Sequence, residues 1–231
     1  AQAGAHIHYL CATRGEGGEV GEPPLSTRAE LGDVREQEMV CAVQPLGAKS
    51  LAFLGYVDPT VGDGDELFPF TDDITMLAGQ VAASIQQHQP DIVISHGSDG
   101  EYGHPAHVVC HQAALAAVAS FEDNAPVLYA PMAIYENHPK PRLANQNEPA
   151  DYILDVQPVM EKKLASALCH KTQHALFVRR TSEDLGRKVE ISEVVLNEES
   201  LHRVYPREIE NDPVYEMLKP TSHIRPAKES K

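Results

Sequence analysis

Residues 96–111 read His-Gly-Ser-Asp-Gly-Glu-Tyr-Gly-His-Pro-Ala-His-Val-Val-Cys-His, and they hold four of the chain's 12 histidines. An apolar, β-branched run at residues 90–95 precedes them and predicts a buried strand. Residues 108–121 follow, rich in alanine and with apolar side chains at helical spacing. The pattern therefore predicts a strand, a polar loop and a helix. In open α/β sheets, ligands bind where such loops leave the carboxyl ends of the strands.

The rest of the chain likewise alternates between segments with the apolar pattern of strands and segments with the apolar spacing of helices. Strands are predicted at residues 5–12, 49–56, 126–135, 152–156 and 189–195, and helices at 26–44, 73–89 and 158–170. This alternation predicts an α/β protein with a Rossmann-like layered α/β/α architecture and a mostly parallel sheet. We expect a single domain over residues 1–231, in which the charged, proline-rich segment 206–231 is a peripheral tail.

The composition excludes several classes of partner. A formal charge of −15 over 231 residues argues against binding to nucleic-acid phosphates or to an anionic membrane surface. No apolar run approaches the roughly 18 residues of a membrane span. The four scattered cysteines are typical of buried, reduced thiols, so we expect a cytoplasmic protein, and we also expect a homo-oligomer.

The spacing of the histidines favours a metal site with an adjacent proton carrier. Pro105 is suited to the first position of a helix, which makes Gly103 or His104 the N-cap. At about 100° per residue, His104, His107 and His111 then point roughly to one side. A neutral imidazole is a good zinc ligand, and a histidine one turn away can act as acid, base or electrostatic stabiliser. We expect His107 to be a ligand and His104 to be its catalytic partner.

Other polar groups of the segment have two interpretations. His111 shares its helical stripe with apolar residues and is expected in the core or beneath the site. Asp99 and Glu101 either cap and turn the loop or take a direct chemical role. His96 ends the strand, where it lines the pocket or is hydrogen-bonded beneath it. We place His96 and Asp99 among the residues that support the site.

The histidine segment also resembles the signature of a known enzyme family. Residues 95–107 read Ser-His-Gly-Ser-Asp-Gly-Glu-Tyr-Gly-His-Pro-Ala-His. This resembles the Gly-His-Pro-Asp-His signature of the zinc-dependent amide hydrolases that deacetylate N-acetylglucosaminyl compounds, the PIG-L or LmbE-like family. Shorter pieces resemble that family in the same order: residues 10–18, Arg35 with Glu38, Leu46-Gly47, residues 54–58 and residues 169–173. The resemblance covers roughly residues 5–175.

The resemblance implies that His107 is a zinc ligand and that His104 is the catalytic histidine. In the implied mechanism, zinc or another divalent metal polarises the acetyl carbonyl and lowers the pKa of its water, an upstream aspartate takes the proton, and protonated His104 helps to hold the oxyanion. The implied substrate is a small-molecule acetamido sugar. Candidates for contacts to its hydroxyl groups are Arg14, Glu16, Asp58 and Tyr102.

One part of the family pattern is absent. The family's other two ligands and its general base come from a His-Pro-Asp-Asp motif after the first strand, and this sequence has no such motif. Ala106 also stands where an aspartate often supports the catalytic histidine. Residues 1–4 resemble the last turn of a helix with its glycine stop, so we expect the first strand, part of the first helix and the remaining ligands upstream of Ala1.

Two other functions remain as alternatives. The first is a metal-free pseudoenzyme, a carbohydrate-binding or regulatory protein on the same scaffold. The second is a nucleotide-binding Rossmann protein, which requires a Gly-x-Gly-x-x-Gly turn that no segment supplies. The glycine-rich residues 13–19 carry acidic side chains that would repel phosphate.

Overall fold

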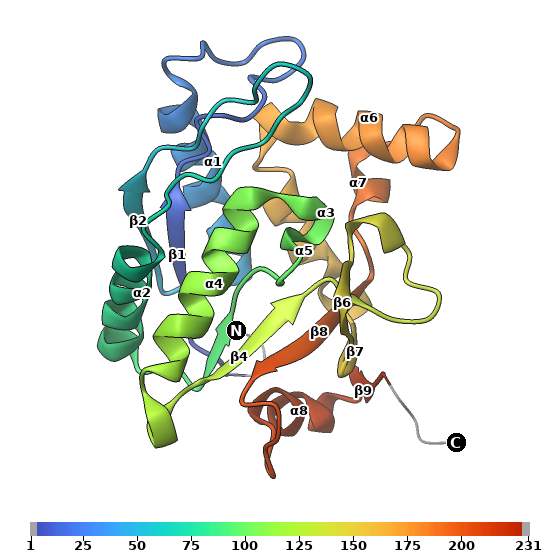
Figure 1. The fold of residues 1–231 in the computed structure, drawn as a ribbon. Helices are drawn as coiled ribbons and strands as arrows, with labels where there is room; N and C mark the ends of the chain where they lie inside the picture. The colour runs from blue at the N-terminus through green and yellow to red at the C-terminus, as the bar shows by residue number, and fades with distance from the viewer. Residues whose placement is uncertain (1–3, 228–231) are drawn as a thin grey trace. The chain divides into compact units, whose positions relative to one another are not determined.

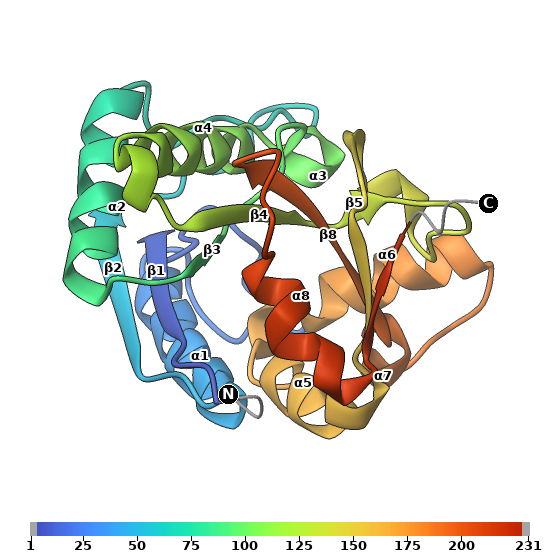
Figure 2. The same ribbon diagram turned by 90° about the horizontal axis from the view of Figure 1, so that it is seen from below.

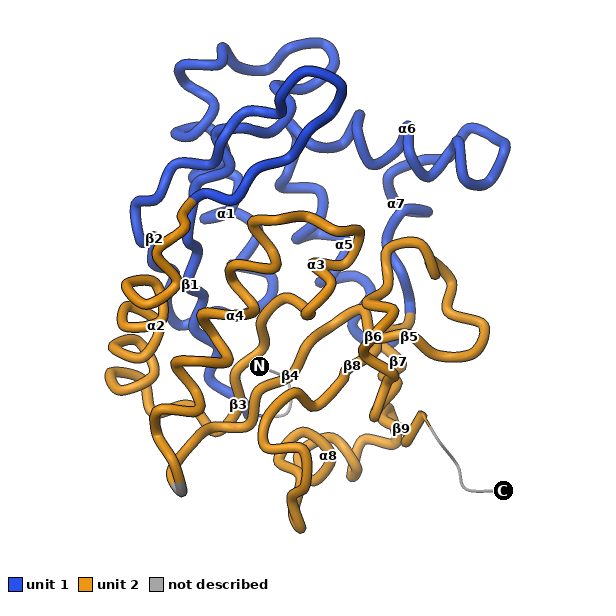
Figure 3. The backbone as a smooth tube through the Cα atoms, viewed as in Figure 1, with its two compact units in different colours: residues 1–70, 157–197 blue, residues 71–156, 198–231 orange. Residues whose placement is uncertain are grey.

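The computed structural model describes residues 4–227, and Figure 1 shows their fold. The chain forms two compact units, each built from two separate stretches of sequence (Figure 3). Unit 1 comprises residues 1–70 and 157–197, and unit 2 comprises residues 71–156 and 198–231. No described helix has the length and apolar composition needed to cross a membrane.

Unit 1 is built around a parallel strand pair. Strand β1 (His8–Thr13) pairs with β2 (Ser50–Tyr56), and helix α1 (Leu31–Leu46) connects them. Helix α1 ends where Gly47 adopts a φ of 75°, the left-handed conformation that glycine adopts without strain. The second stretch of unit 1 adds α5 (Met160–Ala167), which packs on α1, and then α6 (His174–Leu185) and α7 (Ile191–Val194).

Unit 2 contains a five-stranded sheet in the order β3-β4-β8-β7-β9. Its strands are β3 (Ile92–Ile94), β4 (Val127–Pro131), β7 (Tyr152–Asp155), β8 (Glu198–Tyr205) and β9 (Ile224–Pro226). Strands β3 and β4 are parallel, whereas β8 runs antiparallel to its neighbour β4 (Figure 2).

Two further features of unit 2 place the histidine segment. Helices α2 (Ile74–His88) and α4 (Pro105–Ala119) lie side by side, and Ile85, Ala114 and Val118 form a core with Leu128 of β4. A short parallel pair, β5 (Ala133–Ile134) with β6 (Asn145–Pro149), lies between β4 and β7 in the sequence. The short helix α3 (Gly100–Gly103) directly precedes α4.

The strand pairing corrects the predicted sheet. The chain is a mixed α/β protein, because three of the strand pairs in the described residues are parallel and three are antiparallel. The antiparallel pairs all involve β7, β8 or β9. The finer expectation of Rossmann-like layering stays a prediction, as does the single domain.

The strand predicted in the last third of the chain was wrong. Residues 189–195 form a loop and α7 rather than a strand, because Glu190 and Glu193 make a reciprocal capping box that starts a helix. The strand lies later, at β8. The expectation of a peripheral tail over residues 206–231 stays a prediction. The described part of this segment, residues 206–227, adds α8 (Pro213–Leu218) and the edge strand β9 to unit 2, and Val214 is buried.

A buried carboxylate anchors α8 to the sheet. Asp212 accepts hydrogen bonds from the Tyr129 hydroxyl at 2.6 Å and from the Arg203 guanidinium at 2.6 Å, and it caps α8 through the backbone N–H groups of Val214 and Tyr215. Burial alone would raise the pKa of Asp212, but these hydrogen bonds outweigh it and lower that pKa below its ordinary value.

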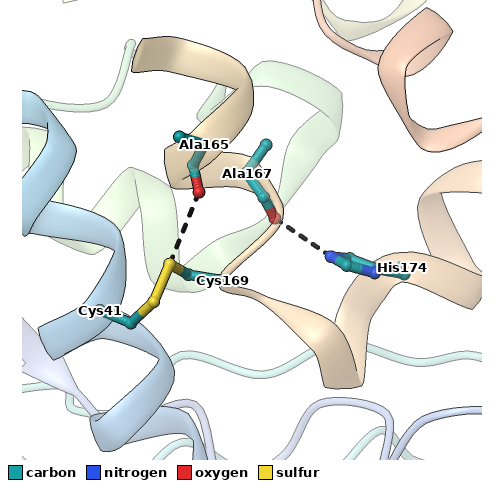
Figure 4. The surroundings of a disulfide bond; sticks show 5 residues. All are labelled: Cys41, Ala165, Ala167, Cys169 and His174. Carbon is teal, nitrogen blue, oxygen red and sulfur yellow. Dashed lines mark hydrogen bonds between the residues drawn. A yellow bond between two sulfur atoms is a disulfide. The ribbon is translucent and has the colours of Figure 1, made fainter. Parts of the chain in front are cut away.

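The cysteines also differ from the prediction. Cys41 of α1 and Cys169, just after α5, form a disulfide with a Cα–Cα distance of 5.7 Å (Figure 4). Cys11 and Cys110 remain as thiols. The cytoplasmic location was inferred from four reduced thiols, so this bond removes that support. The pairing was hidden because the two residues are 128 positions apart and approach only through the packing of α1 on α5.

Candidate active site

The N-terminus of α4 positions two of the histidines. Pro105 occupies the first helical position, and His104 is the N-cap, with its Nδ1 accepting a hydrogen bond from the backbone N–H of Ala106 at 3.2 Å. The chain reaches this point through Gly103, whose φ of 84° turns it from α3 into α4. His107 follows in the first turn of the helix. The sequence analysis predicted this helix start from Pro105.

Three imidazole rings stack in a row at this helix end. The ring of His107 lies between those of His104 and His96, with centroid distances of 4.5 Å and 3.8 Å. Tyr102 meets the rings of His104 and His107 edge-on, each at 5.7 Å. The structure therefore brings together four residues that the sequence predicted for the site, namely His96, Tyr102, His104 and His107.

Glu101 joins two of these rings, a role the sequence analysis did not assign to it. Its Oε2 lies 2.5 Å from Nδ1 of His107 and 3.1 Å from Nδ1 of His96, while its Oε1 accepts from the backbone N–H of Gly97 at 3.1 Å. Burial alone would raise the pKa of Glu101, but the hydrogen bonds from His107, His96 and Gly97 hold it well below the ordinary range. Glu101 is therefore an ionised acceptor at neutral pH.

Strand β6 holds the loop that carries Glu101. The side-chain oxygen of Asn145 accepts from the backbone N–H of Glu101 at 3.0 Å, and its amide nitrogen donates to the carbonyl of Pro131 at 3.0 Å. A β-carbon at Gly97 would overlap the carboxamide of Asn145, so only glycine fits there. Glu148 accepts from the backbone N–H of Ser98 at 3.0 Å. Sequence reasoning missed β6 because these contacts span 44 to 50 positions.

The remaining predicted residues of the segment support the backbone. His111 is buried, as expected, and its Nδ1 donates to the carbonyl of His96 at 2.9 Å. Asp99 accepts two hydrogen bonds from Asn147 of β6, from the backbone N–H and from the side-chain amide. Asp99 therefore anchors the loop on its outer side.

The protonation of His104 follows from its surroundings. Burial, together with the positive charge that His107 and His96 can carry, lowers the pKa of His104 to about 4. The ring is therefore neutral at pH 7. Because Nδ1 accepts the N–H of Ala106, the proton of the neutral ring is on Nε2. This differs from the imidazolium that the sequence analysis expected, and it leaves His104 as a neutral hydrogen-bond donor.

Three of the predicted sugar-binding residues lie together in unit 1. Glu16 accepts from Nε of Arg14 at 3.1 Å and from the backbone N–H of Asp58 at 3.1 Å. The glycine-rich loop beside them wraps a guanidinium, since Arg35 donates to the carbonyl of Gly15 at 2.6 Å. Tyr102, the fourth predicted residue, belongs to unit 2.

The same glycines explain the composition of that loop. A β-carbon at Gly15 or Gly18 would overlap the guanidinium of Arg35 and displace it, and Gly15 also has a φ of 75°, which favours glycine. The loop therefore encloses a cationic side chain of the protein itself.

The donor atoms near the histidine stack are of the types that bind a metal ion such as zinc. One ligand atom from each of His96, Glu101 and His107 lies within 4.8 Å of the others, and imidazole and carboxylate are ligand types that zinc takes. The 2.5 Å between Nδ1 of His107 and Glu101 is nevertheless a hydrogen-bond distance, because two ligand atoms on a tetrahedral zinc lie roughly 3.3 Å apart. In this arrangement, Nε2 of His107 is the ligand atom that remains available.

Comparison with known sequences gives a consistent set of relatives. A family model described as PIG-L, GlcNAc-PI de-N-acetylase, matches residues 1–118. A probable N-acetyl-alpha-D-glucosaminyl L-malate deacetylase 2 from Bacillus anthracis is 30% identical over 188 residues, which cover 79% of this chain and 76% of that protein. A 1D-myo-inositol 2-acetamido-2-deoxy-alpha-D-glucopyranoside deacetylase from Mycolicibacterium vanbaalenii is 31% identical over 54% of this chain and 49% of its own length. The chain spans about half the length of such curated relatives.

Solved structures share the fold at lower sequence identity. GalB, the 4-carboxy-2-hydroxymuconate hydratase from Pseudomonas putida, has a TM-score of 0.57 and 24% identity, covering 91% of this chain and 89% of its own. The N,N'-diacetylchitobiose deacetylase from Pyrococcus horikoshii has a TM-score of 0.53 and 18% identity, covering 87% of this chain and 73% of its own.

Proposed function

The chain belongs to the PIG-L (GlcNAc-PI de-N-acetylase) family, and we propose that it is a zinc-dependent hydrolase that removes an acetyl group from an N-acetylglucosamine-type small-molecule conjugate. The activities for which the sequence relatives are named support this substrate class. The observation that carries the proposal is the pair His104 and His107 at the start of α4, with one ring capping the helix and the other held by Glu101.

His104 has the geometry of an oxyanion donor. Its Nδ1 is engaged by the N–H of Ala106, so its Nε2–H is the group that can donate to a developing negative charge. A neutral donor of this kind stabilises the tetrahedral intermediate without first taking up a proton. Protonation of the leaving amine then requires a proton delivered to His104 during the reaction.

His107 is the residue proposed to hold the metal, through Nε2. A bound zinc would supply a polarised acetyl carbonyl and a water of lowered pKa. Residues 1–231 contain no His-Pro-Asp-Asp motif, so this part of the chain supplies His107 alone of the ligands that the family resemblance implies. Another divalent ion could take the place of zinc at imidazole and carboxylate donors.

We further propose that Arg14, Glu16, Asp58 and Tyr102 contact the hydroxyl groups of the sugar. The hydrogen bonds that join Arg14, Glu16 and the backbone of Asp58 support a preformed polar surface in unit 1. A homo-oligomer and a cytoplasmic location are kept as predictions, which size-exclusion chromatography and fractionation of cells would test.

A metal-free carbohydrate-binding or regulatory protein is the second candidate. One observation favours it: Ala106 gives His104 no carboxylate partner at the position next but one along the chain. The fold does not decide between these functions, since one neighbour is named a hydratase and another a deacetylase.

Elemental analysis combined with an acetate-release assay separates the two candidates. The deacetylase is expected to contain about one zinc per chain and to release acetate from N-acetylglucosamine conjugates. The binding protein is expected to retain the sugar, to contain no metal and to release no acetate. Unchanged acetate release by His104→Ala would contradict the role assigned to His104.

A further inference from the structure

We propose that Glu101, anchored by Asn145, is a positioning residue that holds Nδ1 of both His107 and His96 against its carboxylate, so that the neutral form of each ring is the tautomer with the proton on Nδ1 and the lone pair on Nε2. The consequence for metal binding rests on the proposed function, whereas the protonation pattern itself does not.

The hydrogen bonds of Glu101 determine where the ring protons lie. An ionised carboxylate only accepts hydrogen bonds, so a ring nitrogen at hydrogen-bond distance from it must carry a proton. Both short contacts of Oε2 are to Nδ1 atoms, at 2.5 Å from His107 and 3.1 Å from His96. Each neutral ring then has its lone pair on Nε2, which is the form that binds a metal ion or takes up a proton.

The position of Glu101 is maintained against its backbone preference. Glu101 has φ 59° and ψ −81°, a conformation that is unfavourable for a non-glycine residue and persists only where the surroundings enforce it. Asn145 supplies that enforcement, because it is fully buried, accepts the backbone N–H of Glu101 and is itself tied to Pro131. The other carboxylate oxygen is held by the N–H of Gly97.

Glu101 belongs to α3, and no side chain of the neighbouring first turns of α4 can replace it in this role. Ala106 and Val108, on either side of His107, carry no polar group, and the ring of His104 faces His107 by stacking rather than by a hydrogen bond. His111 contacts the carbonyl of His96 and not its ring. Glu101 is therefore the residue whose carboxylate orients the rings of His107 and His96.

Loss of a carboxylate that orients a ligating histidine weakens metal binding by a known amount. Removing the group that orients a ligating histidine typically lowers metal affinity 10- to 100-fold. We expect the same loss for Glu101→Gln, because a carboxamide cannot accept two hydrogen bonds with the strength of a carboxylate, and its NH₂ group would face a ring nitrogen.

The test measures histidine protonation directly. Long-range ¹H–¹⁵N spectra of ¹⁵N-histidine-labelled protein, free of metal and at neutral pH, report which ring nitrogen carries the proton. The wild-type protein is expected to show Nδ1–H for His107 and His96. Glu101→Gln is expected to convert at least one of them to a mixture with Nε2–H. An Nε2–H ring at His107 in the wild type would overturn the proposal, and this measurement needs no variant.

Zinc binding, measured by competition with a chromophoric chelator, gives the second readout. Glu101→Gln and Asn145→Ala are expected to bind zinc 10- to 100-fold more weakly. Glu122→Gln is the matched control, since Glu122 is exposed, also has a positive φ of 50° and touches none of the histidines in the stack. It is expected to match the wild type in both readouts.

The outcomes separate this proposal from the proposed function. Nδ1–H rings that respond to Glu101→Gln in a protein without zinc binding would sustain the positioning role and overturn the zinc enzyme. Tight zinc binding, with ring protons that Glu101→Gln does not affect, would support the zinc enzyme and overturn the positioning role of Glu101. Loss of the Nδ1 protons on adding zinc would show that the metal takes the position facing Glu101, and would overturn the proposal.

Discussion

His104 has two roles in this structure, and two substitutions separate them. As the N-cap of α4, its Nδ1 accepts the N–H of Ala106. As the proposed oxyanion donor, it offers Nε2–H to the reaction. His104→Ala removes both groups. His104→Asn removes the imidazole but supplies a side-chain oxygen at a position where asparagine is among the preferred caps.

The expected magnitudes differ for stability and for rate. Loss of an N-cap costs about 1 kcal/mol, so His104→Ala should lower the free energy of unfolding by that amount, and His104→Asn by a few tenths of a kcal/mol at most. Loss of one oxyanion donor typically lowers kcat by about 10²- to 10³-fold. Both variants should show that fall in kcat, because neither has an N–H at the position of Nε2.

Urea unfolding and an acetate-release assay on the same preparations give the two quantities. The combination expected is a stable, inactive His104→Asn beside a less stable, inactive His104→Ala. Wild-type kcat in His104→Asn would refute the donor role, and wild-type stability in His104→Ala would refute the capping role.

Three further outcomes are expected. Asp212→Asn leaves the guanidinium of Arg203 without its anion and should lower the free energy of unfolding by about 3 kcal/mol. The pKa of Asp212 is lowered in the folded state, so the ionised carboxylate stabilises the fold fully above the ordinary pKa of 3.8, and this stabilisation is lost as the pH falls below that value. The free energies of unfolding of the wild type and Asp212→Asn, measured in urea, should therefore become more similar as the pH falls from 7 to 3. Cys41→Ser with Cys169→Ser opens a link between positions 128 apart and should cost about 2–4 kcal/mol, whereas a reducing agent should leave that double variant unaffected. Gly97→Ala places a methyl group against a buried carboxamide and should cost about 1–3 kcal/mol in thermal unfolding; a wild-type melting temperature would contradict this packing.

The histidine segment was predictable because its signals are local. A β-branched run, a proline at the first helical position and alanines at helical spacing placed β3 and α4 on either side of the loop. The same spacing placed His104 and His107 side by side and put His111 in the core. Each of these features depends only on residues a few positions apart.

The partners of the segment were not predictable in this way. Glu101 was recognised only as a loop carboxylate, since its function depends on a backbone conformation that a residue with a β-carbon rarely adopts. Asn145 comes from a strand 44 positions later, and the disulfide and the pairing of β9 with β7 likewise join distant parts of the sequence. Such contacts follow from tertiary packing, and no periodicity in the sequence indicates them.

The most direct test of zinc-dependent deacetylation measures acetate release from an N-acetylglucosamine conjugate by the metal-stripped protein, before and after zinc is returned, for the wild type and for His107→Ala. Release that requires zinc in the wild type and is absent from His107→Ala is expected. Full activity in the metal-stripped wild type, or zinc-restored activity in His107→Ala, would contradict the assignment of His107 as the ligand of a catalytic metal.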